Sequence, residues 1–168
     1  MGIVNRISRA IDILTEDGSI EKGDEFEKYV VHLFDTRTYF SIVEWTSDIS
    51  RKQDCFVESD CNPDLVMRYK HKSRNEVFCI ECKYRSNLYD GKLNWSYHSQ
   101  LDRYRKYAKE KGIPFYVVIG LGGSPQYPER MFCIPLKEAK YPALYPSVFE
   151  KYERDPDKMF FWKNGTLR

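Results

Sequence analysis

Residues 77–83 constrain the fold most, because they combine the apolar composition of a buried strand with two charged residues near its end. The segment reads Val-Phe-Cys-Ile-Glu-Cys-Lys. Side chains alternate between the two faces of a strand, so Glu81 and Lys83 share one face, while Phe78 and Ile80 share the other. Charged side chains are seldom buried without partners. The segment therefore predicts a central strand with a polar site on one face.

A second strand is predicted at 64–70, directly after Pro63. The polar residues 70–75 join it to the strand at 76–84 as a hairpin, so Asp64 is expected to face Glu81 and Lys83 across the ladder. Two converging carboxylates repel unless a cation lies between them, and Mg²⁺ prefers oxygen ligands. A lysine beside such an ion can orient water or stabilise charge at phosphorus. This arrangement is typical of phosphodiester hydrolysis with Mg²⁺ or Mn²⁺.

Hydrophobic periodicity gives the order of the remaining elements. We expect helices at 3–14, 24–34 and 95–111, strands at 39–46, 115–121 and 130–135, and loops at 47–62 and 86–94. A chain of 168 residues is expected to form one domain. It is divided into an N-terminal helical extension (1–22), a core (23–135) and a C-terminal segment (136–168). The element order predicts an α/β fold with a mixed central sheet flanked by helices.

The pattern Pro63-Asp64 followed by Glu81-Cys82-Lys83 resembles the PD-(D/E)XK nuclease superfamily, which has the restriction endonuclease-like fold. The resemblance implies an αβββαβ core, which the expected elements between 24 and 121 match. It also implies that Asp64, Glu81 and the carbonyl of Cys82 bind Mg²⁺, and that Lys83 is catalytic.

Three further positions fit this resemblance. Glu27, on the first core helix, matches a family carboxylate that would bind the metal directly or through water. Gln100 and Tyr104, four residues apart on the apolar face of the helix at 95–111, resemble a feature of the RecB-like branch. That feature implies that they orient the site or a DNA phosphate.

Each of these residues also has a structural interpretation. Asp64 is then a turn residue, Glu81 and Lys83 form a surface ion pair, Glu27 is solvated, and Gln100 and Tyr104 only pack. At the level of the whole chain, the alternatives are a non-catalytic DNA-binding or assembly protein of the same fold, an interaction protein that uses residues 3–14, and a zinc module. The zinc module would need Cys55, Cys61, Cys79 and Cys82, but the last two point to opposite faces of a strand.

Charge, cysteine content and hydropathy limit partners and location. The net charge of +2 excludes a histone-like polyanion binder but leaves room for local basic clusters. We predict DNA as partner, with RNA as the alternative, and a homodimer or partner subunit for cutting both strands. Five cysteines and the absence of a long apolar run predict a reduced, cytoplasmic protein with no membrane span. The predicted nucleic-acid contacts are Lys70, Lys72, Arg74, Arg85 and Arg103.

Overall fold

The computed structural model describes residues 21–46 and 62–168. The predicted helix at 3–14 and nearly all of the predicted loop at 47–62 lie outside these residues. Within the described ranges the centre is a six-stranded sheet with the strand order β1-β2-β3-β5-β6-β8. Its strands are β1 (Phe40–Trp45), β2 (Leu65–His71), β3 (Arg74–Arg85), β5 (Phe115–Leu121), β6 (Arg130–Pro135) and β8 (Glu153–Arg154).

The sheet is mixed, as the sequence predicted. β2 and β3 form an antiparallel hairpin with Leu65 opposite Ile80, and its tight turn includes Lys72 at a positive φ of 55°. β3 and β5 run parallel, with Glu81 opposite Val117, and the remaining neighbours are antiparallel. Because α2 (His98–Lys111) lies between β3 and β5 in the chain, it forms the crossover that a parallel pair requires.

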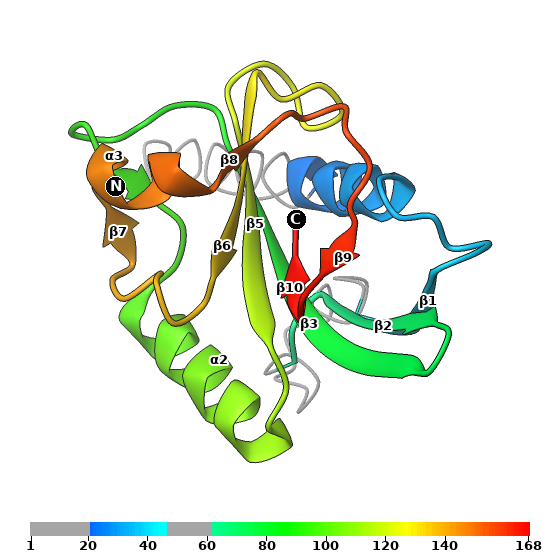
Figure 1. Cartoon of the computed structure of the whole chain (residues 1–168). Coiled ribbons are helices and arrows are strands. Elements are labelled where there is room, and N and C mark those ends of the chain that lie inside the picture. Colours follow the sequence, from blue (N-terminus) through cyan, green and yellow to red (C-terminus); the bar gives the residue numbers. More distant parts are fainter. Residues whose placement is uncertain (1–20, 47–61) are drawn as a thin grey trace, which may run out of the picture.

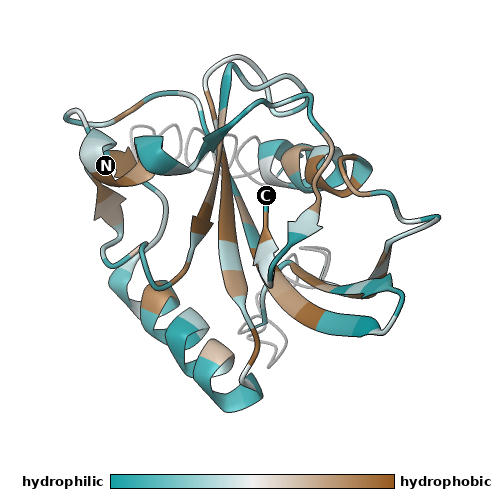
Figure 2. Ribbon diagram, viewed as in Figure 1, coloured by the Kyte–Doolittle hydropathy of each residue, from teal (hydrophilic) through white to brown (hydrophobic). Residues whose placement is uncertain are grey.

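Helices and short strands cover both faces of the sheet (Figure 1). Residues 21–32 are helical and pack on one face together with the small hairpin of β9 (Trp162–Lys163) and β10 (Thr166–Leu167). On the other face lie α2, α3 (Pro146–Phe149) with the 3₁₀ turn η3 (Glu150–Tyr152), and a second small sheet of β4 (Leu93–Asn94) and β7 (Ala143–Leu144). The hydropathy colouring shows apolar residues along the central strands, between these two layers (Figure 2). Each face of the sheet therefore has its own hydrophobic core.

The C-terminal segment completes both cores. Phe160 stacks on Phe34 with ring centroids 4.5 Å apart, and Trp162 stacks on Phe78 at 4.7 Å. The sequence did not show this order because β7 to β10 are only two residues long each, too short for any periodicity. The predicted loop at 86–94 likewise contains β4, which pairs with β7 far along the chain. β4, β7 and β8 are therefore formed by long-range pairing, whereas β9 and β10 form a local hairpin whose strands are too short to be predicted.

Gly120 on β5 lets the helix at 21–32 approach the sheet. A Cβ atom at this position would lie 2.5 Å from Cε2 of Phe26, whose ring is fully buried. Phe26 immediately precedes Glu27 in the chain, so the same close approach sets the height of Glu27 above the sheet.

We predict that Gly120→Ala lowers the free energy of unfolding by about 1–3 kcal/mol, because the added methyl overpacks the Phe26 ring. The melting temperature should fall by about 2–10 °C in calorimetry. Gly23→Ala is the matched control, since a Cβ at Gly23 meets no atom within 4 Å. A Gly120→Ala protein as stable as the wild type would show that this contact does not limit the packing.

Candidate active site

Two buried carboxylates lie side by side where β2 begins and β3 approaches its end. Asp64 directly precedes Leu65, which pairs with Ile80, so Asp64 lies next to Glu81 as the hairpin register predicted. Only 4% of Asp64 and 1% of Glu81 is exposed. Oδ2 of Asp64 accepts a hydrogen bond of 2.7 Å from the backbone N–H of Cys82. Neither carboxylate is therefore a solvated surface group, and the strand backbone itself orients Asp64.

Glu81 is held by two side chains on one of its oxygens. The ammonium of Lys83 and the hydroxyl of Tyr104 both donate to Oε1, each at 2.5 Å. The other oxygen, Oε2, is buried and has no hydrogen-bond partner within the described ranges. A buried acceptor without a partner is costly. Oε2 is therefore a buried acceptor that no described group uses.

The negative charge of the two buried carboxylates exceeds the positive charge of Lys83 beside them. Burial raises the pKa of Asp64 well above its usual value, and the neighbouring Glu81 carboxylate raises it further, while the Lys83 ammonium lowers it. Burial lowers the pKa of Lys83, but the attraction of Glu81 and Asp64 outweighs this effect and the pKa lies above its ordinary value. Two buried carboxylates with one ammonium leave an excess of negative charge, which a divalent cation would compensate.

Glu27 lies at the edge of this site. It is 5% exposed, and Oε2 of its carboxylate accepts a hydrogen bond of 3.3 Å from the indole N–H of Trp45. Its charge contributes to the raised pKa values of Asp64 and Cys82, so it is close to both. Sequence reasoning missed Trp45. The available signal was a large aromatic residue in the predicted strand at 39–46, and Trp45 is the last residue of β1.

Side-chain ligands alone do not complete a metal site. Among the described residues, no three His, Cys, Asp or Glu side chains lie close enough together to hold an ion. A cation at Asp64 and Glu81 would thus need backbone oxygen and water as further ligands. The roles expected of the Cys82 carbonyl and of Glu27, directly or through water, stay predictions.

Gln100 and Tyr104, the two residues of the RecB-like feature, make contacts in different places. Tyr104 is buried and contacts Glu81. Oε1 of Gln100 instead accepts from the backbone N–H of Tyr97 at 3.2 Å, so it helps to cap the start of α2. Tyr97 is 76% exposed. The buried stripe of α2 is therefore narrower than its sequence suggested, and it centres on Leu101 and Tyr104.

The predicted basic contacts lie in three places. Lys70, Lys72 and Arg74 are exposed at the tip of the β2–β3 hairpin. At 3.3 Å per residue, Arg74 is about 23 Å along β3 from Glu81. The hairpin tip is thus remote from the two carboxylates.

Arg85 and Arg103 are closer to the site but are partly buried. The guanidinium of Arg85 donates to the backbone carbonyls of Asn94 (2.6 Å), Tyr84 (2.7 Å) and Trp95 (3.2 Å). It therefore fastens the segment after β3. Arg103 lies on α2, and its buried Nε has no acceptor in the parts of the chain that the structure describes.

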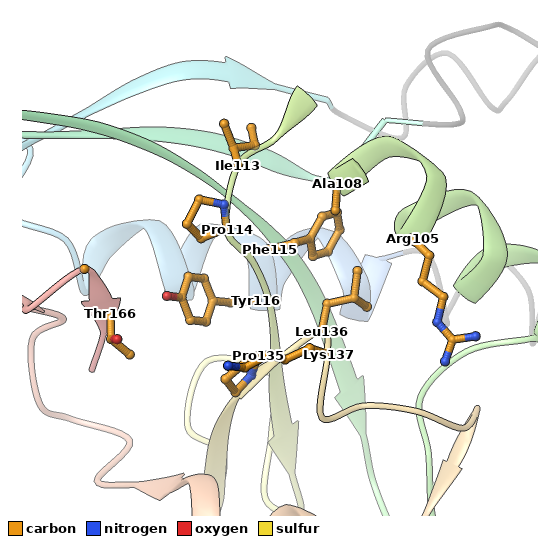
Figure 3. A pocket seen from close by; sticks show the side chains of 11 residues that line it. Arg105, Ala108, Ile113, Pro114, Phe115, Tyr116, Pro135, Leu136, Lys137 and Thr166 are labelled. Carbon is orange, nitrogen blue, oxygen red and sulfur yellow. The ribbon is translucent and has the colours of Figure 1, made fainter. Parts of the chain in front are cut away.

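Neither the cysteines nor the cavity at the amino end of β5 is part of this site. Cys79 and Cys82 are free thiols in the opposite cores of the sheet, so they cannot bind one zinc ion together, and Cys55 and Cys61 lie outside the described residues. A cavity of about 510 Å³ opens at the amino end of β5, between Arg105, Phe115 and Leu136 (Figure 3). Its described lining holds no carboxylate, histidine or cysteine. Its chemistry is that of a binding surface, not of a hydrolytic centre.

Two further observations concern membrane spans and known protein families. No helix in the described ranges is long and apolar enough to span a membrane. No known protein-family model matches the chain, and no curated protein matches it either.

A solved structure does resemble it: Hjc from Archaeoglobus fulgidus, a Holliday junction resolvase from an archaeal hyperthermophile. The TM-score is 0.52 at 19% sequence identity, and the match covers 77% of this chain and 93% of that chain. At this identity the likeness concerns the fold and not the activity. The chain therefore has the mixed α/β, restriction endonuclease-like fold of that protein.

Proposed function

We propose that the chain is a metal-dependent nuclease that hydrolyses phosphodiester bonds in DNA. One observation carries the proposal: the buried carboxylates of Asp64 and Glu81 converge beside the ammonium of Lys83. The fold shared with Hjc, which is a Holliday junction resolvase, supports DNA as the substrate.

The residues present fit a divalent cation. Oε2 of Glu81 is a buried oxygen without a partner among the described residues, and the neighbouring Asp64 carboxylate is destabilised as an anion by burial. Oxygen-only donor sets suit Mg²⁺ and Mn²⁺. Asp64, Glu81 and the Cys82 carbonyl would hold the ion, with Glu27 acting through water. When bound, the ion would offset the carboxylate charge and act as a Lewis acid toward the phosphate.

The chain's own side chains would orient the reactants. An ammonium group has three N–H donors, and Glu81 takes one from Lys83. The others can hold the attacking water or a non-bridging phosphate oxygen, where negative charge develops. Tyr104 donates to Oε1 of Glu81 and so fixes the orientation of this carboxylate. We propose that Gln100, near the start of the same helix, contacts a phosphate.

The rival function is a non-catalytic DNA-binding or assembly protein of the same fold. A binding protein has no need to bury two carboxylates beside a lysine, because this lowers stability without attracting DNA. The rival therefore explains the fold but not the site. Lys70, Lys72 and Arg74 would serve either function, as contacts to DNA about 23 Å from Glu81. A homodimer, action on RNA and a cytoplasmic location remain predictions.

We predict that Asp64→Ala and Lys83→Ala each lower the cleavage rate by at least about 100-fold, as is typical when one group of a preorganised electrostatic site is removed. Supercoiled plasmid, linear duplex and a four-way junction should be tested with Mg²⁺ and with Mn²⁺. The junction is included because Hjc is a junction resolvase.

Asp102→Ala and Lys106→Ala are the matched controls for this assay, since both side chains are 76% exposed on α2. They should cleave at the wild-type rate. Equal cleavage by Asp64→Ala and the wild type would exclude this site as the source of activity. No cleavage of any substrate by the wild-type protein would favour the non-catalytic rival.

We also predict that Asp64→Asn raises the melting temperature of the metal-free protein by about 2–6 °C, because it removes a buried charge worth about 1–2 kcal/mol. The amide oxygen can still accept from the Cys82 N–H. Since the pKa of Asp64 is raised in the folded state, the wild type is penalised above that pKa. The difference between the two proteins should therefore shrink as the pH falls through it.

Mg²⁺ provides the second half of that experiment. Saturating Mg²⁺ should stabilise the wild type by about 1–2 kcal/mol through binding to the folded state, and should not stabilise Asp64→Asn. Thermal melts with EDTA and with Mg²⁺ measure both effects. If Mg²⁺ stabilises both proteins equally, the ion binds somewhere else.

A further inference from the structure

A second hollow, on the opposite side of the sheet from Glu81, has the composition of a nucleotide-binding site. It has a volume of about 390 Å³ and lies between β8 and the β9–β10 hairpin, over Cys133 and Pro135 of β6. Cys133 belongs to the core that includes Phe26, whereas the core on the other face includes Cys79, which shares a strand face with Glu81. A neighbouring hollow of about 400 Å³ shares Phe161, Thr166 and Arg168 with it. Together they form a continuous groove, which we call the β8–β10 groove.

The groove is lined with positive charge. Two carboxylates also line it, Glu153 and Asp155. Glu153 is already bound by Arg130 through hydrogen bonds of 2.7 Å to each oxygen, so its charge is compensated from outside the groove. The cationic side chains of the groove are Lys151, Arg154, Lys158, Lys163 and Arg168.

Arg154 is one of the cations that line this groove. Its guanidinium carbon lies 3.5 Å from the centroid of the Phe160 ring, and its Nη2 donates to the carbonyl of Lys158. The buried Nη1 has no acceptor in the described parts of the chain. Because Nη1 is shielded from solvent, Arg154 contributes positive charge to the groove rather than an exposed donor. Guanidinium charge attracts phosphate groups.

An aromatic ring lies among these cations. Phe161 is 41% exposed, lines both hollows, and has the ammonium of Lys158 at 5.8 Å from its ring centroid. Exposed rings interleaved with cations are typical of surfaces that bind single-stranded nucleic acid, where bases stack and phosphates pair with cations.

We propose that the β8–β10 groove binds nucleotide units of a single DNA strand, with a phosphate near Arg154 and a base on Phe161. The proposal rests on DNA being the substrate of the proposed nuclease. β6 is two strands away from β3, about 10 Å across the sheet, and the groove is on the other face. The groove would therefore hold DNA away from the scissile bond and contribute affinity rather than chemistry.

The test measures binding without hydrolysis. Fluorescence anisotropy of a labelled single-stranded oligonucleotide, titrated with the full chain in EDTA at several salt concentrations, gives the affinity. We expect the double variant Lys158→Glu/Lys163→Glu to bind about 10-fold more weakly, and its log–log salt slope to be shallower by about 1–2 because fewer counterions are released. Both lysines are exposed, so folding should be preserved.

Lys109→Glu/Lys140→Glu is the control, because it makes the same charge change at exposed positions outside the groove. It should weaken binding by less than about 2-fold, which is the effect expected from the change in net charge alone. Equal loss in both double variants, or no loss in the groove variant, would overturn the proposal.

Two unlabelled competitors distinguish a DNA strand from a free nucleotide as the occupant of the groove. Displacement of the strand only by unlabelled single-stranded DNA supports the proposed occupant. Displacement at equal concentration by a deoxynucleoside monophosphate would overturn it in favour of a free-nucleotide site. Since hydrolysis plays no part, groove-dependent binding by a protein that never cleaves DNA would contradict the proposed nuclease and leave the groove assignment standing.

Discussion

The burial of Glu81 in the middle of a sheet is the constraint on which the rest of the site depends. A carboxylate that is 1% exposed requires compensation, and it receives this on one oxygen from Lys83 and Tyr104. Lys83 comes from the same strand face, whereas Tyr104 comes from the helix that crosses between β3 and β5. The parallel pair, the crossover helix and the ion pair are thus parts of one arrangement, which leaves Oε2 of Glu81 without a partner among the described residues.

This arrangement lowers the stability of the protein alone. A single ammonium does not balance the charge of two buried carboxylates in the protein alone. Burial and repulsion by Glu81 therefore raise the pKa of Asp64. Functional sites commonly retain such groups because their charge is used when ligands bind. The close approach of Phe26 to Gly120 and the Trp45 hydrogen bond add a third carboxylate, Glu27, at the margin of the same site. A fold with this site fits a metal-dependent hydrolase better than a scaffold for assembly.

Most strands of the sheet could be predicted from the sequence because each is a continuous segment of apolar or alternating residues. The strands at 115–121 and 130–135, the hairpin, and the pairing of Asp64 with Glu81 were all readable from alternation and register. The contact of Tyr104 with Glu81 also agreed with the predicted place of Tyr104 beside the site. Two contacts between separate parts of the chain could not be predicted: the pairing of β4 with β7 and the hydrogen bond of Trp45 to Glu27. The β9–β10 hairpin is local, but its strands of two residues are too short to show alternation. The capping role of Gln100 and the remote hairpin lysines show that residue type and neighbourhood in sequence do not determine where a side chain points.

The most direct measurement of the central claim is the anomalous diffraction of crystals soaked in Mn²⁺. We expect an anomalous peak between the carboxylates of Asp64 and Glu81, with the Cys82 carbonyl among its ligands, and no such peak in crystals of Glu81→Gln. A wild-type protein whose carboxylates bind no ion at saturating Mn²⁺, or whose Mn²⁺ site is unchanged in Glu81→Gln, would contradict it.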